Sequence, residues 1–397
     1  MTPRAVVALL LQTLRLRGDV DVADLRRHWA ALDPAGLAAL LQYEGCVLWV
    51  HQRLRELQLL ELAPPPFAGW LTAQARRLTA RNLLVDAQRD ALVRILNELQ
   101  VPHVLLKGAA RRLLTRIYPY VGARATSDVD VLLPQEAARP TWVHLQTVGF
   151  AATPDPARRY DGHFHLPPLE NGKAVAVELH TSTSKFVPAP IAWRRLHDNA
   201  RVVACRGGPT RVPSATELLW GAVTHAPIPY PAAFRMRYFH DATVGWAAGP
   251  EVDWGEIDRR LASPEVPNDG LTRRWLGTAA QLCGSAGGEP ALGTLPHLDL
   301  GRALNWRLAV FRLVGDSERA ATGSVWGRQP LSRGRRLLID EATRVELHLP
   351  HSPPRHVTAL HRPGRRVAAA AARLCYRGWR MLHNGFGPAE LSHGTDS

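Results

Sequence analysis

Lysine is almost missing from this strongly basic chain. The 397 residues include 49 lysines and arginines against 35 aspartates and glutamates, a net charge of +14, but only Lys107, Lys173 and Lys185 are lysines. A positive balance can indicate an anionic partner, such as nucleic acid, a nucleotide or a membrane surface. Arginine in place of lysine, with abundant Ala, Gly and Pro, is more typical of a GC-rich genome. Charge alone therefore does not identify a nucleic-acid-binding protein.

Cysteines and long apolar runs are also scarce. The four cysteines lie far apart without metal-ligand spacing, so the sequence predicts neither a disulfide framework nor a zinc site. No stretch has the roughly 18 uncharged apolar residues of a membrane span. The apolar run at the N-terminus is broken by Arg15 and Arg17 and lacks a small-residue cleavage site, which favours a helix over a signal peptide. We expect a soluble, cytoplasmic protein.

The chain changes character near Val101. Apolar residues at helical spacing predict an N-terminal helical region over residues 1–100. Residues 101–205 read as a small unit of strands and helices, with an Asn171-Gly172 hairpin turn between two strand-like runs. A C-terminal helical domain is expected over 206–345, and a loosely ordered basic tail with a terminal helix over 346–397. The predicted fold is α+β: a small mixed sheet between helical regions.

Two aspartates interrupt a run that otherwise reads as a buried strand, "SDVDVLL". On a strand, Asp128 and Asp130 point to the same face, and Val129 and Val131 point to the other. Two neighbouring carboxylates repel one another unless a cation neutralises them, and Mg²⁺ often takes one or two carboxylates together with substrate phosphates. Glu178, at the end of the later apolar run "AVAVELH", is the candidate for a third acid. Three acids could hold two ions around a phosphoryl displacement.

Residues before the acid pair are candidates for binding phosphates. Lys107 and Gly108 follow a strand-like run and precede a helix-like one, where a glycine permits close backbone approach and the ammonium adds a point charge. Arg124 offers a bidentate guanidinium. Ser127 directly precedes Asp128. We therefore assign these four residues to the phosphates of a bound nucleotide.

The joint pattern resembles the nucleotidyltransferase superfamily built on the DNA-polymerase-β-like palm. It is most similar to the family of uncharacterised nucleotidyltransferases, which shares "LLKG" at 105–108, "YP" at 118–119, "RATSDVDVLL" from Arg124 and "ELH" at 178–180. The resemblance extends over about residues 30–260. One departure is Gly108-Ala109, where the superfamily usually has Gly-Ser, with a hydroxyl that commonly touches the γ-phosphate.

The resemblance implies a palm in which Asp128 and Asp130 are metal ligands and Glu178 is the third catalytic acid. It implies an NTP substrate and Mg²⁺, or Mn²⁺, as cofactor. The acceptor stays open between a small molecule, a peptide, a protein and RNA. His180 is a further candidate, because on a strand it faces the same side as Glu178.

Two other functions are kept as alternatives. The first is a non-catalytic nucleotide- or nucleic-acid-binding protein with a degenerate palm, which Ala109 and the basic charge favour. The second is a glycosyltransferase that uses the Asp-x-Asp pair to hold a metal ion and a nucleotide diphosphate.

Two regions outside the motif also give predictions. Asp241 is expected to fix the helical region to the palm. The arginines of the terminal helix are expected to be solvated or to make a weak contact with an anionic surface.

Overall fold

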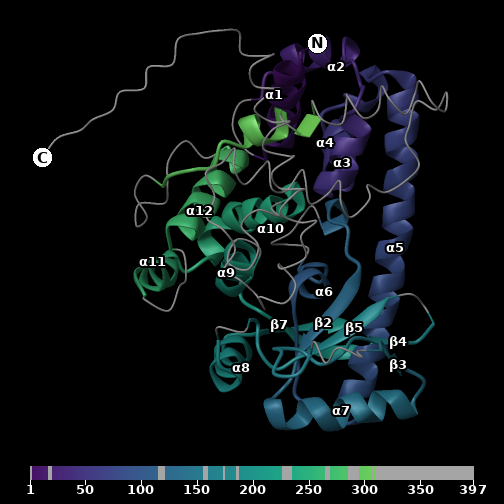
Figure 1. The fold of residues 1–397 in the computed structure, drawn as a ribbon, viewed down its shortest axis with the longest axis vertical. Helices are drawn as coiled ribbons and strands as arrows, with labels where there is room; N and C mark the ends of the chain where they lie inside the picture. The colour runs from purple at the N-terminus through teal and green to yellow at the C-terminus, as the bar shows by residue number, and fades with distance from the viewer. Residues whose placement is uncertain are drawn as a thin grey trace, which may run out of the picture. The chain divides into compact units, whose positions relative to one another are not determined.

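The computed structural model describes ten stretches of the chain, residues 2–16, 20–114, 121–154, 160–172, 175–184, 187–225, 235–263, 269–284, 295–305 and 307–308 (Figure 1). All of them belong to one compact unit formed by Met1–Ile228 and Phe234–Gly327. The predicted tail and its arginine-rich helix lie outside the described residues.

Helices make up the first hundred residues, as the apolar spacing predicted. They are α1(Pro3–Leu14), α2(Val22–Ala30), α3(Leu37–Glu44), α4(Val47–Glu56), the short 3₁₀ helix η1(Leu60–Leu62) and α5(Pro65–Glu98). Helix α2 begins at Asp21, whose carboxylate accepts a hydrogen bond from the Asp24 amide at 2.8 Å, a typical N-cap. The 34-residue α5 begins at Pro65, where a proline needs no hydrogen-bond partner for its nitrogen.

A mixed seven-stranded sheet follows α5. Its strands are β1(Val104–Leu105), β2(Asp128–Leu132), β3(Ala151–Ala152), β4(Leu169–Glu170), β5(Ala176–His180), β6(Arg201–Cys205) and β7(Gly208–Val212), in the order β3-β4-β5-β2-β1-β7-β6. Strand β2 pairs parallel with β5 and antiparallel with β1, and β1 pairs parallel with β7. The α+β class and the shared sheet of the three predicted strands are confirmed. Strand β7 extends the sheet beyond residue 205.

One face of the central strands is fully apolar. Val129 and Val131 of β2 and Val177 and Leu179 of β5 are all 0% exposed. Strict alternation along both strands puts these side chains on one side and the acidic residues on the other. The apolar residues of these strand-like runs are buried: Leu105, Leu106, Val129, Val131, Val175 and Val177.

The turn at Asn171-Gly172 joins β4 to β5 as predicted. The two strands pair antiparallel, with Leu169 opposite Val177, and Gly172 has a positive φ of 76°. A glycine reaches this left-handed conformation without steric cost, which is why the turn uses one.

The other helices are α6(Lys107–Arg111), η2(Val121–Ala123), α7(Gln135–Thr147), α8(Ala189–Asp198), α9(Ala215–His225), α10(Met236–Ala247), η4(Gly249–Glu251), α11(Trp254–Ala262) and α12(Asp269–Cys283). Phe239 of α10 stacks on Trp275 of α12, with ring centroids 4.3 Å apart. Helix α5 packs against β2 and β7, and α6 packs against β2 (Figure 1). Among the described residues, no helix combines the length and apolar character that crossing a bilayer requires.

Candidate functional site

The acidic residues meet on one face at the centre of the sheet. Asp128 and Asp130 are two apart on β2, and Asp130 lies directly opposite Glu178 in the parallel pairing with β5. Asp128 lies opposite Ala176, two residues before Asp130 on β2, so its side chain lies on the same face of the sheet. The strand pairing therefore brings together the three acids that the sequence singled out.

Lys107 and His180 both hold the buried Asp130. The Lys107 ammonium donates a hydrogen bond of 2.6 Å to Oδ1 of Asp130, and Nε2 of His180 lies 2.8 Å from the same oxygen. The same Nε2 lies 3.4 Å from the carboxylate of Glu178. The side chains of Asp130 and His180 are each 1% exposed. His180 thus bridges the acids of two strands, while the ammonium of Lys107 neutralises part of their charge.

These charges shift the pKa values of the two aspartates in opposite directions. Burial opposes ionisation of Asp130, but the Lys107 ammonium and the His180 hydrogen bond outweigh it, so the pKa of Asp130 lies well below its usual range. The pKa of Asp128 is raised, first by burial and then by the negative charge of Asp130. The two carboxylates are close enough to oppose one another, and only Asp130 is well compensated.

The pKa values of Glu178 and His180 also reflect their mutual contact. Despite burial, the hydrogen bond from His180 lowers the pKa of Glu178. Despite burial and the nearby Lys107, the hydrogen bonds to Asp130 and Glu178 raise the pKa of His180. An imidazole with a raised pKa donates readily, which keeps both carboxylates turned toward it.

The donor set of the site fits a divalent cation. One ligand atom each from Asp130, Glu178 and His180 lies within 4.8 Å of the others, so this group could hold a metal ion. Carboxylate oxygens suit Mg²⁺ and Mn²⁺, and an imidazole is also acceptable to Mn²⁺. The pKa of Asp128 is raised by burial first and then by the negative charge of Asp130, and a bound cation would favour its ionised form.

Arg124, which the sequence assigned to phosphates, makes an ion pair within the protein. Its Nε lies 2.8 Å from the carboxylate of Asp241 on α10, and Arg111 of α6 lies 3.2 Å from the same carboxylate. Burial would raise the pKa of Asp241, but the two guanidinium groups hold it far below its usual value. Asp241 thus fixes a helix of the C-terminal region to the palm, as predicted.

Gly108 provides the space for this arginine. A β-carbon at Gly108 would lie 2.5 Å from Nη1 of Arg124 and 2.6 Å from Cγ2 of Thr126, both shorter than real contacts. The preceding Lys107 has a positive φ of 44°, a conformation that costs a non-glycine residue about 1–3 kcal/mol. The chain therefore holds Lys107 in a strained turn, with its ammonium on Asp130.

Sequence reasoning missed the contacts that α5 makes with the segment before β2. The side-chain amide of Asn82 donates to the carbonyl of Arg124 and accepts from the amide of Thr126, both at 2.9 Å. Arg81 donates to the carbonyl of Ser127 at 3.2 Å. A single polar residue inside a long amphipathic helix gives no signal in the sequence for such a role.

A group of rings beside Glu178 was missed as well. His165 lies 4.0 Å from the Glu178 carboxylate, and its ring centroid lies 5.0 Å from that of His180. Tyr160 and His163 pack on His165, with centroids 5.3 Å and 4.2 Å away. The "GHFH" run was the available signal, since two histidines flank one aromatic residue just before the hairpin.

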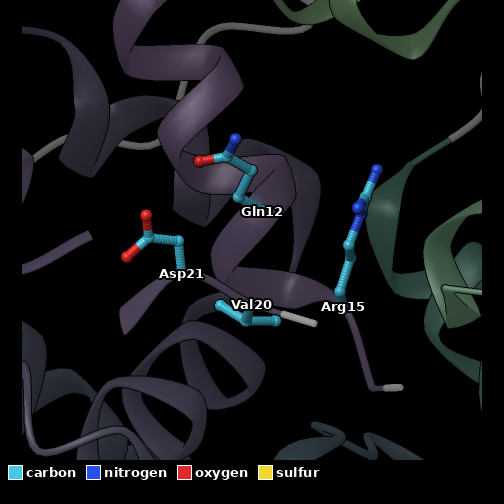
Figure 2. Close-up of a pocket in the computed structure, with 4 residues that line it drawn as sticks. All are labelled: Gln12, Arg15, Val20 and Asp21. Atoms are coloured by element: carbon cyan, nitrogen blue, oxygen red, sulfur yellow. The ribbon is translucent and has the colours of Figure 1, made fainter. Parts of the chain in front are cut away.

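A separate small pocket lies near the N-terminus. It measures about 120 Å³ and is lined by Gln12, Arg15, Val20 and Asp21 (Figure 2). Ligand sites usually measure about 300–1,000 Å³, so this hollow is too small for a nucleotide. None of the acids of the sheet lines it.

Fold and site together define a class of protein: an α+β fold in which carboxylates on two parallel central strands form a site that could hold a metal ion. The family model described as uncharacterised nucleotidyltransferase matches residues 30–268, more than half of the 397-residue chain. The chain belongs to this family, as the motifs predicted. A comparison with curated proteins gave no match.

Proposed function

We propose that the protein is a Mg²⁺-dependent nucleotidyltransferase that moves NMP from an NTP to a hydroxyl or phosphate of an acceptor. The observation that carries this proposal is the parallel pairing of Asp130 with Glu178, which puts acids of two strands side by side in a member of this family. A third acid, Asp128, lies on the same face of the sheet.

In the proposed reaction, Asp128, Asp130 and Glu178 hold the divalent ions. When bound, such ions neutralise charge that develops on the phosphate and lower the pKa of the attacking oxygen. The acceptor oxygen forms a bond to the α-phosphorus, the bond from that phosphorus to the bridging oxygen breaks, and pyrophosphate leaves. The side chain of Glu178 is 20% exposed and that of Asp130 is 1% exposed, so of these two acids Glu178 is the one assigned to take the acceptor proton.

Lys107 is the main cation proposed for the triphosphate. Its side chain is 28% exposed, and its ammonium already lies at the acidic face. Gly108 and Ser127 flank the same site in the sequence and are assigned to the phosphates with it. Arg124, 20% exposed, adds positive potential while it stays bound to Asp241.

One observation favours a second candidate, a protein that binds a nucleotide without catalysis. Ala109 is 1% exposed and follows Gly108, where the superfamily usually has a serine. The position therefore offers no hydroxyl to the γ-phosphate. In this reading, Mg²⁺ and NTP still bind at Asp128 and Asp130, but no transfer follows.

Thermal unfolding with nucleotides tests both candidates. We expect each NTP to raise the melting temperature only with Mg²⁺, and to do so less in Asp128→Asn. Matched samples contain a UDP-sugar or a GDP-sugar with Mg²⁺. Stabilisation by a sugar nucleotide alone would favour the glycosyltransferase, and no shift with any nucleotide would refute the proposed NTP site. Stabilisation without release of pyrophosphate, across a panel of acceptors, would favour the non-catalytic candidate.

A further inference from the structure

Helix α5 holds the backbone that leads into the acidic strand. Asn82, only 2% exposed, bonds through both ends of its amide: Nδ2 to the Arg124 carbonyl and Oδ1 to the Thr126 amide, each at 2.9 Å. Residues 125–127 have no regular secondary structure, so no strand ladder supports this stretch. One buried side chain therefore supplies the hydrogen bonds that a neighbouring strand would otherwise supply.

On one edge, all of β2 from Asp128 to Leu132 pairs with β5, but on the β1 edge its two ends are held by different means. At Asp130, the carbonyl accepts from the Leu106 amide at 2.9 Å, so the neighbouring β1 chain fixes this residue. Strand β1 pairs with Leu132 and Val131 but does not reach Asp128. On the β1 edge of this strand, helix α5 holds the segment before Asp128 instead. Asn82 makes the two bonds described above, and Arg81 donates to the carbonyl of Ser127.

We infer that Asn82 is a positioning residue that sets the place of Asp128 relative to Asp130 and Glu178. This inference rests on the proposed metal site. Asn82 touches none of the acids, and it acts through the backbone of Arg124 and Thr126. An amide is required because the two bonds need a donor and an acceptor on one planar group, which neither aspartate nor leucine provides.

The chain contains a matched control on the same helix. Asn97, near the far end of α5, also uses its side-chain amide on the backbone of a distant segment, donating to the carbonyls of Gly207 and Pro209 at 3.3 Å and 3.0 Å. These carbonyls belong to the connection between β6 and β7 and to the start of β7. Asn97→Ala therefore removes comparable bonds between α5 and the sheet without touching the segment before Asp128.

The test measures Mn²⁺ affinity by electron paramagnetic resonance and stability by urea denaturation in the full chain. Residues that orient metal ligands typically change affinity by about 10–100-fold, so we expect Asn82→Ala to weaken Mn²⁺ binding by about tenfold or more. Asn97→Ala should lower the urea midpoint but leave Mn²⁺ affinity unchanged. Asn82→Asp keeps the acceptor for the Thr126 amide, and we expect an intermediate loss.

The outcomes separate this inference from the proposed function. The positioning role alone would be overturned if wild type binds Mn²⁺ and if Asn82→Ala and Asn82→Asp, both folded, bind it equally well. Wild type that does not bind Mn²⁺ would overturn the metal site and the positioning role together. If Asn82→Ala fails to fold, the test relies on Asn82→Asp. A Mn²⁺ affinity of Asn82→Asp equal to that of wild type would then refute the inference.

Discussion

Two clusters of charged side chains, each built around a buried carboxylate, differ in the balance of positive and negative charge. In the arginine cluster, Arg111 and Arg124 share Asp241, and the side chains of Arg111 and Asp241 are only 6% and 5% exposed. In the acidic cluster, Asp128, Asp130 and Glu178 share the ammonium of Lys107. The first has two guanidinium groups for one carboxylate, and the second has three carboxylates for the ammonium of Lys107 and the imidazole of His180.

The pKa shifts follow this difference in balance. The two arginines hold the pKa of Asp241 far below its usual value despite complete burial. The pKa of Asp128 is raised, because burial and Asp130 outweigh the attraction of Lys107. Each cluster has a buried carboxylate, Asp130 or Asp241, so burial alone does not distinguish the two clusters. The excess of carboxylates in the acidic cluster is what supports the proposed metal site, since a bound cation would balance it.

The largest expected effect comes from Asp130→Asn. The asparagine keeps an oxygen that can accept from Lys107 and His180, but it removes the best-compensated carboxylate of the proposed metal site. Metal ions contribute several kcal/mol to such reactions, so nucleotidyl transfer should fall by at least about a thousandfold, measured as pyrophosphate release. In EDTA, the free energy of unfolding should fall, because the lowered pKa of Asp130 means that its charge stabilises the fold. The fall should be smaller than for Asp241→Asn, because Asp128 and Glu178 still neutralise part of the Lys107 charge.

The second-largest expected effect is a loss of stability when the arginine cluster is disrupted. Asp241→Asn leaves two guanidinium groups without their carboxylate, and breaking such a buried pair typically costs about 3–5 kcal/mol. Urea denaturation measures the loss. The control is Asp198→Asn, whose carboxylate is 66% exposed beside His197 and should contribute less than about 1 kcal/mol. If Asp130→Asn in EDTA proved as destabilising as Asp241→Asn, the contrast between the clusters would fail.

Much of the acidic cluster could be predicted from the sequence, because its geometry is local. Alternation in "SDVDVLL" fixes which side chains share a face of β2, and the same rule applies to Glu178 and His180 on β5. The hairpin at Asn171-Gly172 made it plausible that the later strand would lie near the first. The family motifs then indicated which acids belong together.

The arginine cluster could be predicted only in outline, and the support from α5 was not predicted. Arg124 and Asp241 are separated by 117 positions, and Asn82 and Arg124 by 42. No periodicity links residues so far apart, so the contact between Arg124 and Asp241 could not be derived from the sequence. The assignment of Arg124 to phosphates remains a prediction. Strands β3 and β4 have two residues each, too few for any alternation. The limits of the domains remain a prediction.

A third prediction concerns Lys107 in the acidic cluster. Lys107 bonds to the Asp130 oxygen at 2.6 Å, so its ammonium competes with a metal ion for that carboxylate. Lys107→Met should therefore raise the affinity for Mn²⁺ alone by about tenfold, or ~1.4 kcal/mol. The same change should weaken binding of the NTP, because the proposed phosphate contact is lost. Calorimetric titrations with Mn²⁺ and then with Mn²⁺ and NTP measure the two effects.

Lys107→Arg serves as the control, since it keeps the positive charge. It should leave the affinity for Mn²⁺ closer to that of wild type. A loss of Mn²⁺ affinity in Lys107→Met would mean that the lysine supports the metal site and does not compete with it.

The smallest effect is a pH dependence confined to the arginine cluster. Asp241 has a folded pKa below its unfolded value of about 3.9, so its contribution to stability is fully present above that value and is lost as the pH falls. The groups that face it are Arg111 and Arg124, which stay charged, and His240, whose Nδ1 lies 3.7 Å away. Burial lowers the pKa of His240, so this imidazole is neutral near pH 7.

The difference in unfolding free energy between wild type and Asp241→Asn should therefore be constant from about pH 8 to pH 5. Below about pH 4 it should narrow by about 1.4 kcal/mol per pH unit, because the unfolded wild type then binds one more proton than the folded one. Urea midpoints of both proteins across this range measure the difference. A difference that already narrows near pH 6 would mean that His240 takes up a proton beside Asp241. The stability of the cluster would then depend on the imidazole, and the simple contrast between a complete cluster and an incomplete one would no longer hold.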